Sequence, residues 1–221
     1  ASGPRIVERI LAGETCALVS DAGSPAISDP GEDLVRLCAE AGVTVSAIPG
    51  PCAAITALSM SGLPTGRFTF EGFLSTTKKN RAQHLDSLRG EQRTMIFYEA
   101  PHKLCATLRD LAAAFGGERR ISLCRELTKL HEEVLRLTLD GAVAYYETQP
   151  PRGEYVLIVE GAPKQQESGP VSEEEALMRV QALLAEGLSR KDAVRQVAAE
   201  TGLAKNQLYD AALRAQHTET E

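Results

Sequence analysis

Short apolar runs alternate with stretches of helical composition along the first part of the chain. Residues 16–19 and 43–48 are apolar, and each run leads through a turn of small residues into a helical stretch, at residues 32–41 and 53–61. Apolar runs of this length between Gly and Pro residues are typical of buried strands. The pattern therefore predicts two consecutive strand–turn–helix units.

The alternation continues after Gly62-Leu63-Pro64-Thr65-Gly66, the strongest cluster of breaker residues in the first half of the chain. Beyond it, the pattern predicts strands at residues 68–70, 94–98, 121–124, 134–139 and 155–159, and helices at residues 81–89, 103–115 and 139–147. We expect an α/β protein with a first lobe at residues 1–64 and a second lobe at residues 65–162.

The end of the chain has a different pattern. Residues 163–171 show no apolar periodicity, which is typical of a linker. Residues 172–216 predict three short helices with glycine at the turns, and this resembles a helix-turn-helix module. A packing or dimerisation appendage is the alternative. The start of the third helix, where such modules contact nucleic acid, carries Lys205, Asn206, Gln207 and Tyr209.

Composition narrows the class of protein. Of the 221 residues, 43% are hydrophobic, as in ordinary globular proteins, and no run approaches the 18 apolar residues of a membrane span. The cysteines are odd in number and widely spaced, which predicts reduced thiols, a cytoplasmic location and no metal site. A net charge of −6 argues against binding RNA by bulk electrostatics, although local basic patches remain compatible with it.

Two turns rich in small residues follow the first two predicted strands. They read SDAGSPAISDPG at residues 20–31 and IPGPCAA at residues 48–54. Ligands of open α/β sheets bind at the carboxyl ends of strands, and glycine allows backbone to approach them closely. Ordinary turn chemistry is the alternative. Neither turn is a GxGxxG or P-loop motif, so the sequence does not support dinucleotide or nucleoside-triphosphate chemistry.

Four segments in order carry a resemblance to a known family: SDAGSPAISDPG, AIPGPCAAITALSMSGLPTGRFTFEGFL, IFYEAPHKL and CRELTKLHEEV. They resemble the tetrapyrrole-methylase superfamily, and most closely its RNA-acting branch, ribosomal RNA small subunit methyltransferase I. The resemblance implies two α/β lobes with S-adenosylmethionine in the cleft between them. It also implies a homodimer that methylates the 2′-hydroxyl of a cytidine in 16S ribosomal RNA of the small subunit.

The chain departs from that family pattern in several places. The family opens with a strand carrying a Thr-Pro-Ile-Gly-Asn-type turn and an Ala-Glu-Asp-Thr-Arg-type segment, and neither is present. The chain begins at Ala1, so we expect a fragment or a sequence without its N-terminal part. Ser24 replaces the usual Thr and keeps the hydroxyl, whereas Cys52 replaces the usual Ser and would weaken a hydrogen bond to the cofactor.

Residues at predicted strand ends are the candidates for catalysis. A ribose hydroxyl is a weak nucleophile at neutral pH, so a base or a nearby cation would assist it. The candidates are Glu99, Glu126 and Lys129. Glu99 could instead cap the helix that follows it, and the other two could form an ordinary salt-bridged loop.

The remaining candidates bind cofactor or RNA. Expected at the cofactor are Asp21, Gly23, Ser24, Ile27, Pro51, Cys52, Ala53, Tyr98, Gly153 and Glu154, the last two on the resemblance alone. Expected at RNA phosphates are Lys78, Lys79, Arg81 and Arg125, with solvated surface as the alternative.

Two other functions stay open at this point. One is methylation of a porphyrin-like small molecule, which would need neither the basic loop nor the C-terminal helices. The other is a non-catalytic RNA-binding remnant, which the missing opening motif favours.

Overall fold

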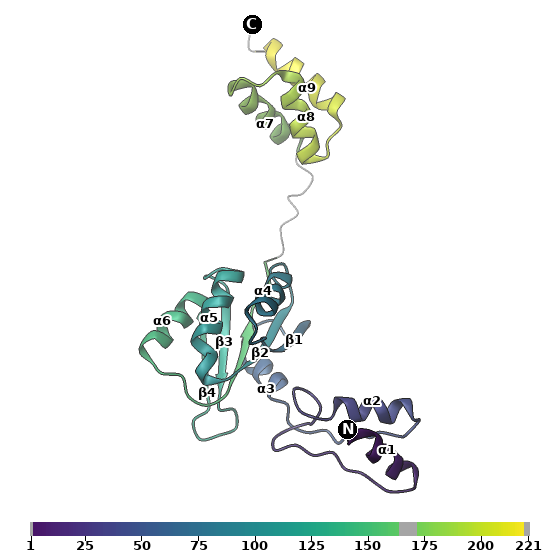
Figure 1. Ribbon diagram of the computed structural model, residues 1–221. Helices are drawn as coiled ribbons and strands as arrows, with labels where there is room; N and C mark the ends of the chain where they lie inside the picture. The colour runs from purple at the N-terminus through teal and green to yellow at the C-terminus, as the bar shows by residue number, and fades with distance from the viewer. Residues whose placement is uncertain (1, 164–171, 219–221) are drawn as a thin grey trace. The chain divides into compact units, whose positions relative to one another are not determined.

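The computed structural model describes residues 2–163 and 172–218, and the side chains of the second range as far as residue 213. The chain divides into two compact units at residues 1–163 and 164–221 (Figure 1). Apart from Pro163, the predicted linker lies outside the described residues.

A five-stranded sheet organises the first unit, in the order β1-β2-β5-β3-β4. The strands are β1 (Phe68–Phe73), β2 (Thr94–Glu99), β3 (Arg120–Arg125), β4 (Glu133–Thr138) and β5 (Tyr155–Val159). β1 is parallel to β2, and the other neighbours are antiparallel. The ends of β1, β2 and β3 therefore lie at one edge together with the starts of β4 and β5. We call this edge the carboxyl edge.

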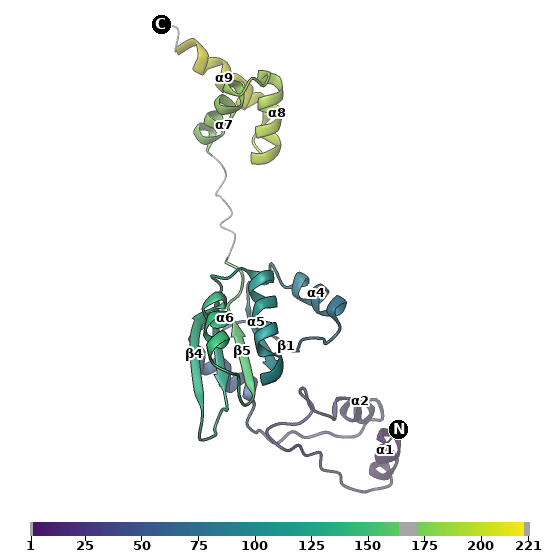
Figure 2. The same cartoon turned by 60° about the vertical axis from the view of Figure 1, so that its left-hand side comes forward.

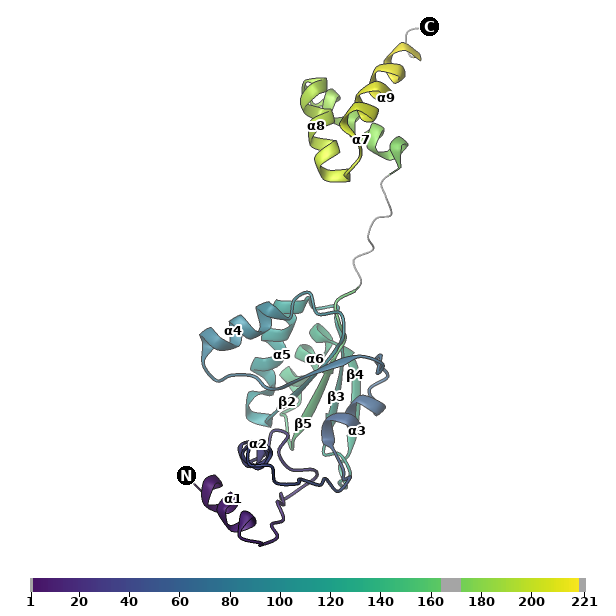
Figure 3. The same cartoon turned by 90° about the vertical axis from the view of Figure 1, so that its right-hand side faces the viewer.

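Helices cover both faces of the sheet (Figure 3). One face packs on α5 (Pro101–Phe115) and α6 (Leu139–Thr148), with α4 (Lys78–Ser87) beside α5. The opposite face packs on α3 (Ala53–Met60). Alternation along β2 explains this, because Met95 and Phe97 point to the first core and Ile96 to the second. Each fully buried side chain of this size stabilises the fold by roughly 1.5–3 kcal/mol.

The segment before α3 contains two helices, α1 (Gly3–Leu11) and α2 (Glu32–Glu40), but no strand. The strands predicted near residues 16–19 and 43–48 are therefore wrong. Both segments run as irregular chain, and Val19 and Ile48 are 82% and 90% exposed. An apolar run favours extended backbone, but a strand forms only where a neighbouring strand supplies hydrogen bonds, and neither segment has such a partner among the described residues.

Three helices make up the described part of the second unit: α7 (Glu173–Ala185), α8 (Arg190–Thr201) and α9 (Lys205–Thr218) (Figure 2). Ser172 and Ser189 cap α7 and α8 through their side chains, and Gly202 ends α8 with a φ of 72°. The α/β class with C-terminal helices is thus confirmed. The helices share a small core of Ala176, Val180, Ala193, Val194, Val197, Leu208 and Ala212.

Candidate functional site

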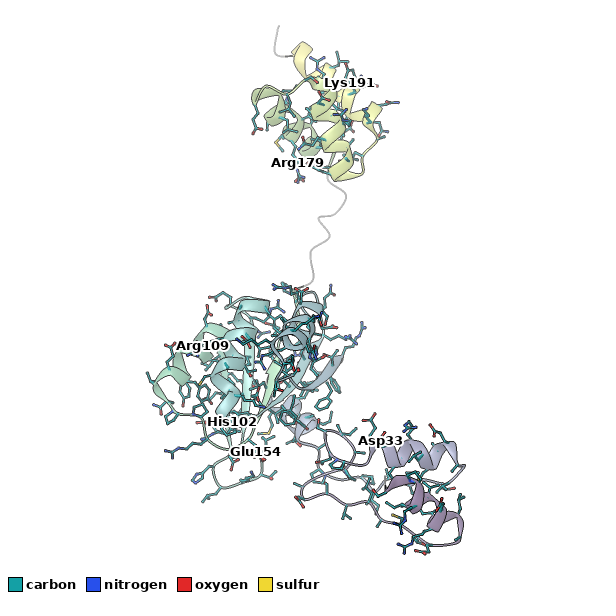
Figure 4. The ribbon with its side chains drawn as sticks, in the orientation of Figure 1. Asp33, His102, Arg109, Glu154, Arg179 and Lys191 are labelled. Carbon is teal, nitrogen blue, oxygen red and sulfur yellow. The ribbon has the colours of Figure 1, made fainter. Side chains whose placement is uncertain are left out.

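The carboxyl edge gathers candidate residues from distant parts of the sequence. Tyr98 and Glu99 end β2, Glu126 follows β3, and Gly153 and Glu154 precede β5. His102, in the first turn of α5, and Glu154 lie at this end of the sheet (Figure 4). The topology alone therefore brings several predicted residues together.

The two small-residue turns lie against each other. The Ser24 backbone N–H donates to the Pro51 carbonyl at 3.0 Å. Gly23 has a φ of 79°, and a Cβ there would lie 2.7 Å from the same carbonyl oxygen. Only glycine tolerates both the positive φ and the close approach of the Pro51 carbonyl, so position 23 requires glycine. Asp21 and Ile27, from the first turn, are exposed beside this contact.

Tyr98 joins the second of these turns to the sheet. Its hydroxyl accepts a hydrogen bond of 3.1 Å from the Ala54 N–H in the first turn of α3. Burial raises the pKa of Tyr98, and the nearby Cys52 and Asp29 raise it further. Tyr98 is therefore a neutral phenol at physiological pH, and it connects the second turn with the end of β2.

A second cluster surrounds Lys129. Its ammonium lies 3.0 Å from Glu126 Oε1 and 3.2 Å from Glu154 Oε2. Glu126 Oε1 also accepts the Glu154 N–H at 3.1 Å. Gly153 has a φ of 75°, and a Cβ there would lie 2.5 Å from Glu126 Oε1. The loop after β3 and the turn before β5 are thus fitted closely to each other.

Each charge in this cluster favours the ionised form of its neighbour. Lys129 lowers the pKa of Glu126, aided by the backbone N–H of Glu154. Glu126 and then Glu154 raise the pKa of Lys129. Both members of the pair are therefore ionised at neutral pH. With half of its side chain exposed, Lys129 presents a fixed cation that can stabilise an anion.

Glu99 faces the other side of the sheet. It is 4% exposed, and its carboxylate accepts hydrogen bonds from the Ala100 N–H at 2.9 Å and from the Thr107 hydroxyl. Both donors belong to the start and first half of α5. The N-cap of α5 is Ala100, which makes no side-chain capping bond, so Glu99 does not cap the helix; it binds α5 on the face of the sheet opposite to Tyr98.

The four predicted RNA-contacting residues have different surroundings. Lys78 and Lys79 are exposed at the start of α4, and in the described part of the chain no acidic side chain forms an ion pair with either. Arg81 donates to Asp110 at 2.5 Å and to Thr107 at 2.9 Å, and its side chain is only 15% exposed. Arg125 Nε lies 3.1 Å from Glu133 Oε2, an ion pair without hydrogen-bond alignment.

Two residues near the site escaped the sequence analysis. Phe70 and Phe73 contact the Tyr98 ring and stay substantially exposed. The available signal was three phenylalanines in the six residues FTFEGF. A hollow of about 560 Å³ lies at the opposite edge, next to Thr94, Phe115 and Arg119, far along the strands from these groups.

Neither a membrane span nor a metal site is found among the described residues. No helix there is both long and apolar enough to cross a bilayer. No group of three or more His, Cys, Asp and Glu side chains there could hold a metal ion.

Comparison with family models gives two matches. Residues 3–143 match the Tetrapyrrole (Corrin/Porphyrin) Methylases, and residues 171–216 match the RsmI C-terminal HTH domain. The family match covers the two turns, Tyr98 and the Lys129 loop.

Curated proteins are similar over nearly the whole chain. A Synechocystis protein named ribosomal RNA small subunit methyltransferase I is 49% identical over 94% of this chain and 74% of its own length. An Escherichia coli O157:H7 protein of the same name is 44% identical over 96% of this chain and 73% of its own length.

Solved structures share the fold at low sequence identity. The methyltransferase CobJ has a TM-score of 0.56 at 20% identity, covering 72% of this chain and 70% of its own. A uroporphyrin-III-C-methyltransferase from Thermus thermophilus has a TM-score of 0.51 at 19% identity, covering 72% and 69%. These likenesses establish the fold alone.

Proposed function

The chain belongs to the tetrapyrrole methylase family, in its ribosomal RNA small subunit methyltransferase I branch, and on that premise we propose that it methylates the 2′-hydroxyl of a cytidine in 16S ribosomal RNA, with S-adenosylmethionine as methyl donor. The observation that carries the proposal is the sequence identity of 49%, over 94% of this chain, with a protein of that name. A ribosomal substrate places the reaction in the cytoplasm, and we propose a homodimer as the acting form.

The residues of the two turns fit such a cofactor. Gly23 and Pro51 approach so closely that a side chain at residue 23 would displace the turn. Ser24 and Ala53 flank this contact, Asp21 offers carboxylate oxygens, and Ile27 offers an apolar surface that is 55% exposed. Apolar surface with a few polar groups suits a nucleoside cofactor. When bound, S-adenosylmethionine supplies an activated methyl group and a neutral leaving group.

We assign the handling of charge to the cluster around Lys129. The 2′-hydroxyl would give its proton to water as it takes the methyl group that the bound donor would supply. Lys129 stabilises the negative charge that develops on the 2′-oxygen, while Glu126 and Glu154 hold the ammonium in place. Glu99 acts through the packing of α5, as a positioning residue, because its carboxylate is buried on the opposite face.

The test follows labelled methyl groups from S-adenosylmethionine. The full chain is incubated with 30S subunits, with free 16S ribosomal RNA, or with a uroporphyrinogen. We expect label in 16S RNA, recovered as 2′-O-methylcytidine after nuclease digestion and mass spectrometry. Label on a base, on another ribose or on the tetrapyrrole would contradict the proposal. RNA binding with no transfer to any acceptor would identify a non-catalytic RNA-binding protein.

A further inference from the structure

We infer that Phe70, Phe73 and Tyr98 form an aromatic platform on which an unpaired nucleobase of the RNA substrate stacks, and this inference rests on the proposed function. Stacking on aromatic side chains is the usual way in which proteins hold single-stranded bases. The platform borders the candidate cofactor turn, and the exposed lysines of α4 follow its strand in the sequence. Neither the family matches nor the related proteins assign a role to these rings.

The three rings form one continuous surface. The Phe70 and Tyr98 centroids are 5.2 Å apart with an interplanar angle of 76°, and the Phe73 and Tyr98 centroids are 5.6 Å apart at 64°. The strand pairing explains how Phe70 and Phe73 reach the same face, although they are three residues apart. A bulge between Phe70 and Gly72 shifts the register, so that Phe73 pairs with Tyr98.

The platform is open because α3 does not extend over β1. α3 packs on β5 and β2, which leaves the edge strand uncovered on that face. Phe70 is 37% exposed and Phe73 is 58% exposed. The chain has only five phenylalanines, and the two outside β1 are buried in the core. The exposed phenylalanines of this chain are therefore the three of β1.

The platform borders the candidate cofactor turn. A Cβ built on Gly72 would lie 3.7 Å from Ser28 Oγ, so the end of this turn runs beside the bulge. Asp29, the next residue, is near enough to Tyr98 to influence its titration. A base stacked on Phe73 would thus place its ribose beside the segment expected to hold the methyl donor. A methyl acceptor requires this proximity.

Charge favours RNA over a second protein chain as the occupant. Arg67 directly precedes β1, and Lys78 and Lys79 begin α4 only a short loop after it. All three cations are exposed. Cations that flank the ring-bearing strand along the chain suit the phosphates on either side of a stacked base. A protein–protein interface of this kind would instead be depleted of lysine at its centre.

The experiment replaces the rings while it keeps apolar side chains. The double variant Phe70→Leu, Phe73→Leu and the single variant Phe73→Leu are compared with the full natural chain, and Phe68→Leu is the matched control. Phe68 lies on the same strand and is 38% exposed. The probe is a short single-stranded oligoribonucleotide with one 2-aminopurine, whose fluorescence is quenched when it stacks on an aromatic ring.

We expect the natural chain and Phe68→Leu to quench the probe, and the two platform variants to lose this quenching. Loss of stacking should weaken RNA affinity about 5- to 150-fold. Affinity for S-adenosylmethionine, measured by calorimetry, should be unchanged. If the double variant does not fold, the single variants Phe73→Leu and Phe73→Tyr are compared instead. The tyrosine ring should keep the quenching of the probe, whereas leucine should abolish it.

Five outcomes would overturn the inference. Quenching and RNA affinity could persist in folded Phe73→Leu. Alternatively, the variants could lose affinity for S-adenosylmethionine alone, and the platform would then be a site for the adenine of the cofactor. A change in mass by light scattering would identify it as an interface between copies. If the natural chain neither binds RNA nor methylates 30S subunits, the proposed function fails and the platform with it. If the natural chain methylates 30S subunits and the platform variants bind RNA and methylate equally well, the platform inference fails and the proposed function stands.

Discussion

Four non-glycine residues adopt a positive φ in the described part of the chain, and all four lie in the loops of the candidate site. They are Ala26, Ser28, Glu126 and Thr128, with φ between 51° and 70°. Each such residue costs of order 1–3 kcal/mol and persists only where its surroundings impose the conformation. Here the imposing contacts are those between the two turns and those between Glu126, Lys129 and Glu154. Strain confined to these loops supports their functional assignment.

Gly23→Ala tests the first of these loops. The added Cβ would meet the Pro51 carbonyl at 2.7 Å, on a backbone with a φ that side chains disfavour. We expect affinity for S-adenosylmethionine to fall at least about tenfold, because the turn must move. Calorimetry measures it. Gly90→Ala is the control, since a Cβ there meets nothing within 4 Å. Equal affinities for the two variants would remove Gly23 from the cofactor site.

Lys129→Met tests the second loop by rate and by titration. The methylation rate should fall about 10²- to 10⁴-fold while cofactor affinity persists. Loss of the cation should also return the pKa of Glu126 upward toward its usual value, since Lys129 is the main cause of its lowering. NMR titration of the Glu126 carboxyl carbon measures this shift.

The pH dependence of the pair has a definite sign. A lowered folded-state pKa gives stabilisation that is complete above the unfolded value and is lost as the pH falls through the folded value. The difference in stability between the natural chain and Glu126→Gln should therefore disappear on acidification and persist at neutral pH. A difference that grew as the pH fell would contradict the ion pair. Urea unfolding at several pH values measures it.

At the scale of elements, one polar network connects β2, α5 and α4. Glu99 accepts from Thr107, Thr107 accepts from Arg81, and Arg81 pairs with Asp110. Because Glu99 is almost fully buried, the loss of either hydrogen-bond donor to its carboxylate would destabilise the fold. The network orients α4, which carries Lys78 and Lys79, relative to the carboxyl edge. Arg81 thus has a structural function that a basic-cluster pattern does not reveal.

Thr107→Val tests the network. Valine has nearly the same shape as threonine but leaves the Glu99 carboxylate without its hydroxyl donor. We expect a loss of about 2–3 kcal/mol in the free energy of unfolding, measured with urea. Thr107→Ser keeps the hydroxyl and should cost clearly less. Similar losses for both variants would show that packing, rather than the hydrogen bond, dominates at this position.

At the scale of the whole molecule, the chain consists of two units with separate cores. The core of α7, α8 and α9 is small, so each of its buried residues carries a large share of the stability of that unit. Separate cores allow separate unfolding transitions.

Leu208→Ala tests this independence. Leu208 is completely buried, and its truncation should destabilise the helical unit by about 2–5 kcal/mol. Hydrogen exchange should accelerate in α7, α8 and α9 and stay unchanged in the sheet. Affinity for S-adenosylmethionine should be unaffected. Faster exchange in β2 or β5 would show that the two units unfold together.

The sequence by itself determined the local structure of the five-stranded sheet and of the helical unit. β2, β3, β4 and β5 lie where apolar runs predicted them, because β2, β3 and β5 are buried in the sheet and β4 pairs with β3 at its edge. The serine caps and Gly202 also mark helix ends at the level of the sequence. Such features depend on neighbouring residues, so local patterns are sufficient to predict them.

Only the tertiary structure decided which residues meet. The same kind of apolar run at residues 16–19 forms no strand, because a strand depends on a partner that no local pattern specifies. Arg81 and Lys79 look alike in the sequence, yet Thr107 and Asp110 bind the first and leave the second exposed. The register shift that brings Phe73 onto Tyr98 likewise arises from pairing between strands. Contacts between distant segments follow from topology, and topology is a property of the whole fold.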